Sequence, residues 1–561
     1  MFLSELQVEN FRAIRRGAIN FDDGTVLIGE NDCGISSMLD TLELVLGFDD
    51  PQKVYPPWLF HRNQVTGESG GPIRIRLRFT ERSENEWKTE ESGPLGPLLR
   101  SRSNRPREIW YEAEIREPGE SADKARYRLR SPGCKTELNE SGIIGRFRRM
   151  NPVVRVAAGM LTGHGFTGEL MRGGGLPELK VSADIRELIE RINRAVESRI
   201  TRKSMNPGKA LEDGIDAAIS LVRLHKASLG KWESGLTRSV KEILGWRPGR
   251  DHLASLESFR DPESEPERLG ILLLIAALLR AAPGGMAPDA DPLWIIEEPE
   301  AHLHPITLTS VAEMIRLVQR QKVITTYSGD LLSTVSLGQV RRMVRHNGEL
   351  HQRRVHRNTL SRSEMRRFQY HLRSHFGIST FARLWLLVEG ESEYWFLPQL
   401  ARLMGYDLAL EGIACIEFAQ CGLDAPLKVA RDLGIEWHLL ADGDAAGQLY
   451  ADVARHYIGE NDEDERLTIL AEKEIERCFW AHGYEDVYKK HARLKDDRLN
   501  QLSTGKVIKA AVRKRSKPFL ALSIIEAIAS PESRGIPPQL SGMIETCIDL
   551  ARRAPSRTVN S

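Results

Sequence analysis

The stretch from Leu384 to Gly447 constrains the fold more than any other part of this chain. Its first apolar run, Leu384–Val388, stops at Glu389, and a second run, Trp437–Leu440, is followed closely by Asp442-Gly443-Asp444. Short apolar runs that end in Gly and acids are typical of buried parallel strands with the acids at their carboxyl ends. A parallel βαβαβ sheet with its site beyond the strand ends is therefore predicted. The intervening elements are a helix at 392–404, a strand at 413–419 and a helix at 425–433.

Three acids, Glu389, Asp442 and Asp444, would converge at that edge of the sheet. Carboxylate oxygens without Cys or His beside them suit Mg²⁺ or Mn²⁺ rather than zinc. Either acidic segment alone would equally describe a surface loop whose acids form salt bridges. Two such segments at two strand ends, each with a Gly, favour a divalent-metal site.

A second pattern of the same kind occupies the amino-terminal part. The apolar run Val26–Ile28 leads into Gly29–Ser37, which has the spacing of a phosphate-binding loop that opens a helix. Ile35 stands where such a loop has its lysine. The missing charge-assisted hydrogen bond, worth roughly 1.5–3 kcal/mol, should weaken nucleotide binding by about one to two orders of magnitude. The loop residues that remain for nucleotide binding are Gly29, Asn31, Gly34, Ser36 and Ser37.

Glu389-Gly390-Glu391 followed by Asp442-Gly443-Asp444 resembles a Toprim domain, the metal-binding fold shared by topoisomerases, primases and certain nucleases. The phrases at 387–391, 416–420 and 434–438 resemble the OLD (overcoming lysogenisation defect) family of nucleases, and its YbjD-type subgroup in particular. In that family an ABC-type ATPase precedes the Toprim domain. The resemblance implies an α/β fold: an ABC-type ATPase with an inserted helical arm, followed by a Toprim domain with a Rossmann-like parallel sheet.

Glu297 and Glu298 follow another apolar run and resemble a Walker B motif. By position, Glu297 would hold Mg²⁺ and Glu298 would orient the attacking water. Two departures accompany Ile35: the signature segment Glu263–Glu267 lacks its glycines, and Tyr327 stands where the family often has a histidine. A degenerate ATPase that acts as a scaffold or a weak nucleotide sensor is therefore expected, with only weak binding of ATP.

Further residues complete the expected nuclease site. Glu476 matches the family's late acidic element. Alternatively, it is simply an acid at the start of a helix, where the helix dipole favours negative charge. Lys517 matches a late lysine that would stabilise charge on the phosphate being cut. Two cations about 4 Å apart would clamp the attacking and leaving oxygens, and Glu393 would serve the second cation. The predicted catalytic residues are Glu389, Asp442, Asp444 and Lys517, and the predicted metal ligands are Glu389, Glu393, Asp442, Asp444 and Glu476.

Charge is balanced overall, with 79 Lys and Arg against 78 Asp and Glu, so net charge says nothing about a polyanionic partner. Locally, residues 489–517 contain eleven Lys or Arg against two Asp, as a phosphate-binding surface requires. A solvated face is the alternative explanation. We expect Arg513, Lys514 and Arg515 to contact DNA.

The predicted domain organisation has five ranges. Apolar residues at helical spacing recur from Ile185 to Ile200 and from Leu211 to Leu224. Such helices resemble the arm through which OLD-family proteins dimerise, and packing within the chain is an equal alternative. The ranges are 1–175 and 251–375 for the two parts of the ATPase, 176–250 for the helical arm, 380–530 for the Toprim nuclease domain and 531–561 for a C-terminal helical tail.

Six cysteines without CxxC or zinc spacing indicate a reducing cytoplasm. The first residues lack the basic and then apolar order of a signal peptide. The longest apolar run, 269–279, is too short to span a bilayer. The expected protein is therefore cytoplasmic and has no membrane partner.

The leading hypothesis is a metal-dependent DNA endonuclease that forms a homodimer or a larger homo-oligomer. The resemblance further implies a role in defence against phage or plasmids, with a partner defence protein. Two alternatives stay open: a non-catalytic ATPase-like assembly platform for a defence complex, and another Toprim DNA-processing enzyme. A topoisomerase would need a tyrosine nucleophile in a DNA-gate domain, and a primase usually has zinc-binding cysteines; neither is visible.

Overall fold

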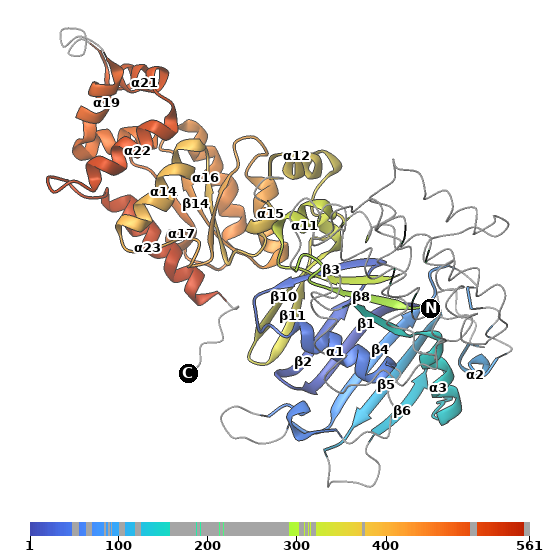
Figure 1. Cartoon of the computed structure of the whole chain (residues 1–561). Helices are drawn as coiled ribbons and strands as arrows, with labels where there is room; N and C mark the ends of the chain where they lie inside the picture. The colour runs from blue at the N-terminus through green and yellow to red at the C-terminus, as the bar shows by residue number, and fades with distance from the viewer. Residues whose placement is uncertain are drawn as a thin grey trace. The chain divides into compact units, whose positions relative to one another are not determined.

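The computed structural model divides into two units, residues 1–352 and residues 353–561 (Figure 1). Apart from four single positions, the predicted arm at 176–250 lies outside the described residues, and so does the segment Glu263–Glu267. The five predicted domain ranges stay predictions. The structure describes residues 1–47, 55–62, 70–83, 86–87, 90, 93–99, 107–117, 125–156, 291–301, 321–372, 376–493 and 502–554, together with the single positions 187, 191, 213, 217, 308, 312 and 315.

The described part of the first unit is built on an 11-stranded mixed sheet in the order β6-β5-β4-β1-β2-β11-β10-β3-β9-β8-β7. Pairing is antiparallel from β6 to β2 and parallel from β10 through β3, β9 and β8 to β7. The strands are β1 (Phe2–Phe11), β2 (Ile14–Asn20), β3 (Gly24–Gly29), β4 (Ile73–Thr80), β5 (Glu108–Ile115), β6 (Ala125–Arg130), β7 (Val153–Val156), β8 (Leu293–Glu297), β9 (Lys322–Thr325), β10 (Val340–His346) and β11 (Glu349–Arg353).

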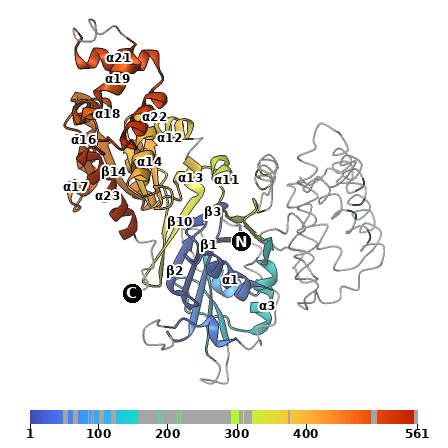
Figure 2. The ribbon, with the colours of Figure 1, turned by 60° about the vertical axis from the view of Figure 1, so that its left-hand side comes forward.

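Alternating side chains explain how this sheet forms its core. In β4, Ile73, Ile75 and Leu77 are buried, whereas the arginines between them face outward, as a half-buried strand requires. Helix α1 (Ile35–Leu46) buries its apolar side in the same core, and α3 (Ser141–Met150) packs beside it (Figure 2). The short helix α11 (Gly329–Thr334) follows β9.

The second unit contains a four-stranded parallel sheet in the order β13-β12-β14-β15. The predicted βαβαβ alternation is confirmed, and the α/β fold class with it. The elements of this alternation are β12 (Leu384–Val388), α14 (Glu391–Leu403), β13 (Ile413–Glu417), α15 (Asp424–Leu433) and β14 (Glu436–Ala441), and α16 (Ala445–Ile458), α17 (Glu463–Arg466) and β15 (Leu467–Ile469) follow.

Helices enclose this sheet, which is why β12 is buried along its whole length. Helices α14 and α23 (Pro538–Arg553) share one apolar core with β12, so the C-terminal helix packs within the second unit. Towards one end of the unit, α19, α21 and α22 gather together (Figure 1). The remaining helices are α12 (Arg362–Leu372), α13 (Phe376–Ser379), α18 (Ile475–Phe479), α19 (Glu485–Ala492), α21 (Thr504–Lys514) and α22 (Lys517–Ile528).

Candidate functional site

Two neighbouring strands place the first acids of the site. β12 and β14 pair in parallel with Val388 opposite Leu440, so both strands end at the same edge of the sheet. Glu389 directly follows β12, and Asp442 directly follows β14. Because both strands are buried, the register of the sheet is firmly held and keeps these two residues together.

Two glycines after β14 allow the chain to turn tightly behind Asp442. A Cβ atom at Gly447 would collide with the main chain of Asp442, because the first turn of α16 folds back onto the strand end. One at Gly443 would meet the carbonyl oxygens of Leu470 and Glu472, and the Gly443 N–H donates to the latter at 3.0 Å. The Asp-Gly-Asp-x-x-Gly spacing is thus required by close approach of the backbone.

Negative charge accumulates around Asp442. Burial, followed by the charges of Glu393, Glu389, Glu476 and Asp444, raises the pKa of Asp442 to about 8. The structure therefore brings the other four acids predicted as metal ligands within electrostatic reach of Asp442. Five carboxyl groups in one place repel each other when ionised, and a bound cation relieves that repulsion.

Glu389 and Glu393 reach the same site from β12 and from the first turn of α14. Burial and the charge of Asp444 raise the pKa of Glu389, whereas Lys517 lowers it. Its Oε2 atom is buried and has no hydrogen-bond partner in the described structure. For Glu393, burial is the largest cause of a pKa raised to about 7, and Lys517 again opposes the shift. The ammonium of Lys517, at the start of α22, therefore acts on both carboxylates.

The other two acids have partners of their own. Asp444 is exposed and caps α16, since its Oδ1 accepts hydrogen bonds from the N–H groups of Ala446 and Gly447, each at 2.9 Å. Glu476 is buried, and its Oε1 accepts a 2.6 Å hydrogen bond from the Ser392 hydroxyl. Sequence reasoning missed Ser392, because a serine within an acidic segment carries no distinctive signal.

The donor set fits a divalent cation, although the side chains are not drawn together around one point. Among the described residues, no three His, Cys, Asp or Glu side chains form a ready-made ligand group. Ionised carboxylates repel one another, and the ammonium of Lys517 acts on two of these acids, Glu389 and Glu393. The unpartnered Oε2 of Glu389, the raised pKa of Asp442 and the oxygen-only donors all suit Mg²⁺ or Mn²⁺.

The loop after β3 departs from a nucleotide site in shape as well as in sequence. Ile35 is buried in the core of the sheet, and Gly29 lies so close to it that a Cβ atom there would touch Ile35 and clash with Cys33. Gly34 adopts a left-handed backbone with φ of 108°. Asn31 and Ser36 are exposed, and Ser37 is half-buried. The position of the expected lysine is thus filled by a packed apolar side chain.

The acids at the end of β8 also interact with other residues of the protein. Arg155 of β7 donates to Glu297 at 2.7 Å and forms further ion pairs with Asp40 at 2.6 Å and Glu43 at 2.8 Å. Glu297, predicted to hold Mg²⁺, is therefore neutralised by a guanidinium. Glu298 has a left-handed backbone with φ of 44°, and burial together with the charges of Glu300 and Glu297 raises its pKa.

The helical end of the second unit carries cations without acidic partners. No ion pair within the described structure involves Arg513, Lys514 or Arg515, the residues predicted to contact DNA. On the exposed face of the 11-stranded sheet, by contrast, Arg76 and Arg128 both pair with Glu112. Positive charge is compensated on that sheet and left uncompensated on these helices, which favours a polyanion at the helical surface. Residues 494–501 of the predicted basic stretch lie outside the described part.

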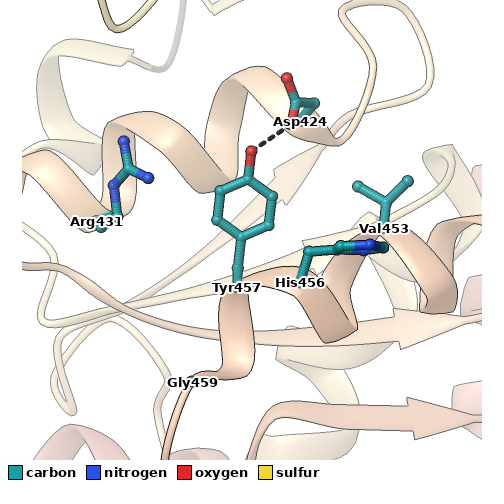
Figure 3. A pocket seen from close by; sticks show the side chains of 6 residues that line it. All are labelled: Asp424, Arg431, Val453, His456, Tyr457 and Gly459. Atoms are coloured by element: carbon teal, nitrogen blue, oxygen red, sulfur yellow. Dashed lines mark hydrogen bonds between the residues drawn. The ribbon is translucent and has the colours of Figure 1, made fainter.

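A cavity of about 540 Å³ lies between α15 and α16. Figure 3 shows the Tyr457 hydroxyl directed at Asp424, which also pairs with Lys428 at 2.5 Å, while Arg431 lies beside the tyrosine. Val453 is nine residues beyond Asp444, so the cavity begins about 13 Å along α16 from the acids. Its polar side chains already have partners within the chain, and we assign it no ligand. No described helix has the length and apolar character needed to cross a membrane.

Two family descriptions match this chain. Residues 1–379 match "Protein of unknown function (DUF2813)", and residues 380–444 match "Overcoming lysogenization defect protein-like, TOPRIM domain". The relative "Uncharacterized protein YbjD" from Escherichia coli (strain K12) is 30% identical over 575 residues, which cover 98% of this chain and 99% of the relative. These matches confirm the predicted resemblance to YbjD-type, OLD-like proteins.

Solved structures resemble parts of the chain. The C-terminal region of the Xanthomonas campestris pv. campestris OLD protein, phased with platinum, is 19% identical, with a TM-score of 0.26 over 30% of this chain and 94% of that one. The SMC head domain from Thermotoga maritima is 15% identical, with a TM-score of 0.31 over 64% of this chain and 100% of that one. Likenesses at these values assign no activity. By its sequence matches, the chain belongs to the DUF2813 family, and its second unit carries a Toprim domain of the OLD type.

Proposed function

We propose that this chain is a metal-dependent nuclease that cleaves phosphodiester bonds of DNA at the edge of its Toprim sheet. The observation that carries the proposal is the gathering of four acids around Asp442, whose pKa is raised to about 8, with the ammonium of Lys517 acting on two of them, Glu389 and Glu393. A cluster so rich in like charge is costly to the folded chain and is therefore typical of functional sites. A purely structural cluster would contain a matching number of cations.

Glu389, Asp442 and Asp444 would hold one Mg²⁺ or Mn²⁺, and Glu393 and Glu476 would serve a second. When bound, such cations polarise a phosphate and supply a hydroxide near neutral pH. The chain's own residues have separate tasks. The hydrogen bond from Ser392 orients Glu476, and the turn at Gly443 and Gly447 sets the direction of Asp442. Lys517 offsets the negative charge that develops on the phosphate.

The uncompensated cations of Arg513, Lys514 and Arg515 support DNA as the substrate. They precede α22, whose first residue is Lys517, so the basic surface is continuous in sequence with the proposed site. A DNA strand whose phosphates bind along these helices would extend towards the acids of the proposed site. Endonucleolytic cutting is part of the proposal, because nothing in the described site requires a strand end.

The first unit is proposed to act as a scaffold or a weak nucleotide sensor, without turnover of ATP. The buried Ile35 removes the cation that would meet the terminal phosphates, and Arg155 takes up the charge of Glu297. Neither feature prevents the loop from presenting N–H groups to a phosphate, so weak binding is retained in the proposal.

The remaining expectations belong to this proposal. The family resemblance supports a homodimer or a larger homo-oligomer, and a defence role against phage or plasmids with a partner defence protein. All six cysteines are present as thiols, which supports a cytoplasmic setting.

The proposal is tested by incubating supercoiled plasmid with the purified full chain and Mg²⁺ or Mn²⁺, with and without ATP. Cutting is expected with either metal and without nucleotide, and Glu389→Gln should abolish it. Glu417→Gln is the matched control, because Glu417 ends the neighbouring strand β13 yet does not act on Asp442. Absence of cutting by the unmodified protein, or full activity of Glu389→Gln, would contradict the proposal.

A further inference from the structure

Helix α22 presents large apolar side chains to solvent immediately after Lys517. Phe519 is 40% exposed and Leu522, one turn further on, is 52% exposed. The opposite side of the helix is buried in the core of the second unit through Leu520, Ala521 and Ile524. The exposed pair is therefore additional to what the fold needs, and an exposed phenylalanine beside a proposed active site requires an explanation.

Positive charge surrounds the exposed ring. The Arg515 guanidinium lies over Phe519 with its carbon 4.8 Å from the ring centroid, and the His491 ring meets it edge-on at 5.2 Å. The pKa of His491 is lowered by burial and by Arg515, Lys490 and Arg493, with only Glu526 opposing. Among the described residues, no ion pair neutralises these three cations.

This combination selects one kind of occupant. An apolar protein surface would have to desolvate three unpaired cations, which is costly. A nucleic-acid strand satisfies both features, because its phosphates meet the cations and a base can stack on the ring. In a duplex the faces of the bases are stacked on one another, so a paired base reaches the ring only at the cost of unstacking, whereas an unpaired base does not. The cations thus point to a nucleic acid, and the exposed ring points to DNA that is locally single-stranded.

Phe519 and Lys517 belong to the same turn of α22 but to different sides of it. Residues two apart on a helix do not face each other, so the axial rise of about 3 Å is not the distance between their side chains. A base on Phe519 would therefore belong to DNA bound along the flank of α22, and not to the nucleotide next to the phosphate that Lys517 addresses. Arg515, on the other side of Lys517 in sequence, would steady the nucleotide whose base stacks on Phe519.

We propose that Phe519, together with Arg515, is a stacking platform for an unpaired base of the bound DNA. The inference rests on the proposed nuclease function and deepens it: the substrate class is DNA with a single-stranded stretch, such as a gap, a loop or a displaced strand. The nucleotide is held by its aromatic face, so little preference among the four bases is expected.

Binding is measured in EDTA, so that no cutting occurs, by fluorescence anisotropy of labelled oligonucleotides. The probes are a 20-nucleotide single strand, the same sequence as a duplex, and a duplex with a five-nucleotide gap. Phe519→Ala should weaken binding of the single strand and the gapped duplex by about 5- to 150-fold and leave the intact duplex within about twofold. Phe519→Trp should retain the affinity, and Leu522→Ala, an exposed apolar residue of the same helix, should change none of the three.

Several results would overturn the stacking platform. An equal loss on all three probes, no loss on any, or the same loss in Leu522→Ala would each show that the ring does not receive an unpaired base. Circular dichroism of each variant checks that the fold is retained, and Phe519→Trp provides the test if Phe519→Ala unfolds. Plasmid cutting by the unmodified protein is measured in parallel. Its absence would refute the proposed nuclease, whereas cutting with unchanged binding by Phe519→Ala would refute only the platform.

Discussion

Replacing Asp442 with asparagine is expected to stabilise the metal-free protein, although it removes a proposed metal ligand. Burial and the neighbouring acids raise the pKa of Asp442 to about 8 in the folded chain, whereas an aspartate of an unfolded chain titrates near about 3.9. Between these values the folded protein holds a proton that the unfolded chain has released. The free energy of unfolding therefore falls as the pH rises from about 4 to about 8.

The size of this effect follows from the two pKa values. The two pKa values differ by about 4.1, and each unit of pKa is worth about 1.36 kcal/mol. Above pH 8, the ionised Asp442 therefore lowers the free energy of unfolding by at most about 5.6 kcal/mol. Because Asp442 is only half-buried, solvent screens part of the repulsion, and we expect about 2–3 kcal/mol. At about 1.36 kcal/mol for each pH unit above about pH 4, this amount is reached near pH 6. Asp442→Asn should therefore gain it at pH 6 and at pH 8.5, and nothing near pH 4. For a unit of this size the full gain corresponds to about 4–12 °C in Tm.

The assay is thermal unfolding of the full chain in EDTA at pH 4, 6 and 8.5. Asp549→Asn is the matched control, because Asp549 is an exposed aspartate on α23. Adding Mg²⁺ at pH 8.5 should raise the Tm of the unmodified protein and have much less effect on Asp442→Asn. The electrostatic reasoning is refuted if Asp442→Asn is less stable than the unmodified protein at pH 8.5, or if its gain is the same at pH 4.

Four further outcomes are expected. Lys517→Gln should slow plasmid cutting by about 10²- to 10³-fold and leave Mg²⁺ affinity, measured by calorimetry, undiminished; lost affinity at an unchanged saturated rate would contradict this role. Ser392→Ala should weaken Mg²⁺ binding by about 10- to 100-fold, since a buried carboxylate loses its donor, and Ser392→Thr should restore it. Arg155→Gln should lower the free energy of unfolding by about 1–3 kcal/mol in urea, because it leaves Glu297 unpaired. Phosphate release from ATP should stay near background with and without DNA; robust release that Glu298→Gln abolishes would show an active ATPase.

The sequence by itself determined the sheet of the second unit and the acids at its edge. The runs that became β12 and β14 are short, mostly apolar and followed by Glu389 and Asp442, and such a signal depends only on neighbours in the chain. The departure at Ile35 was equally local, because the spacing of a phosphate loop assigns one position to lysine. The alternation of apolar and arginine residues along β4 is a local signal of the same kind.

Only the tertiary structure decided which distant side chains meet. Ser392 and Glu476 are 84 residues apart, and Arg155 and Glu297 are 142 apart, yet each pair is joined by a hydrogen bond. Such contacts depend on how helices and strands pack, and one local pattern is compatible with many packings. The same holds for charge. The composition gives only the numbers of cations and acids. The folded chain shows that arginines on the 11-stranded sheet pair with acids, whereas, among the described residues, those of α21 and the turn before α22 do not. The reason is that ion pairing depends on distance in space and not on order along the chain.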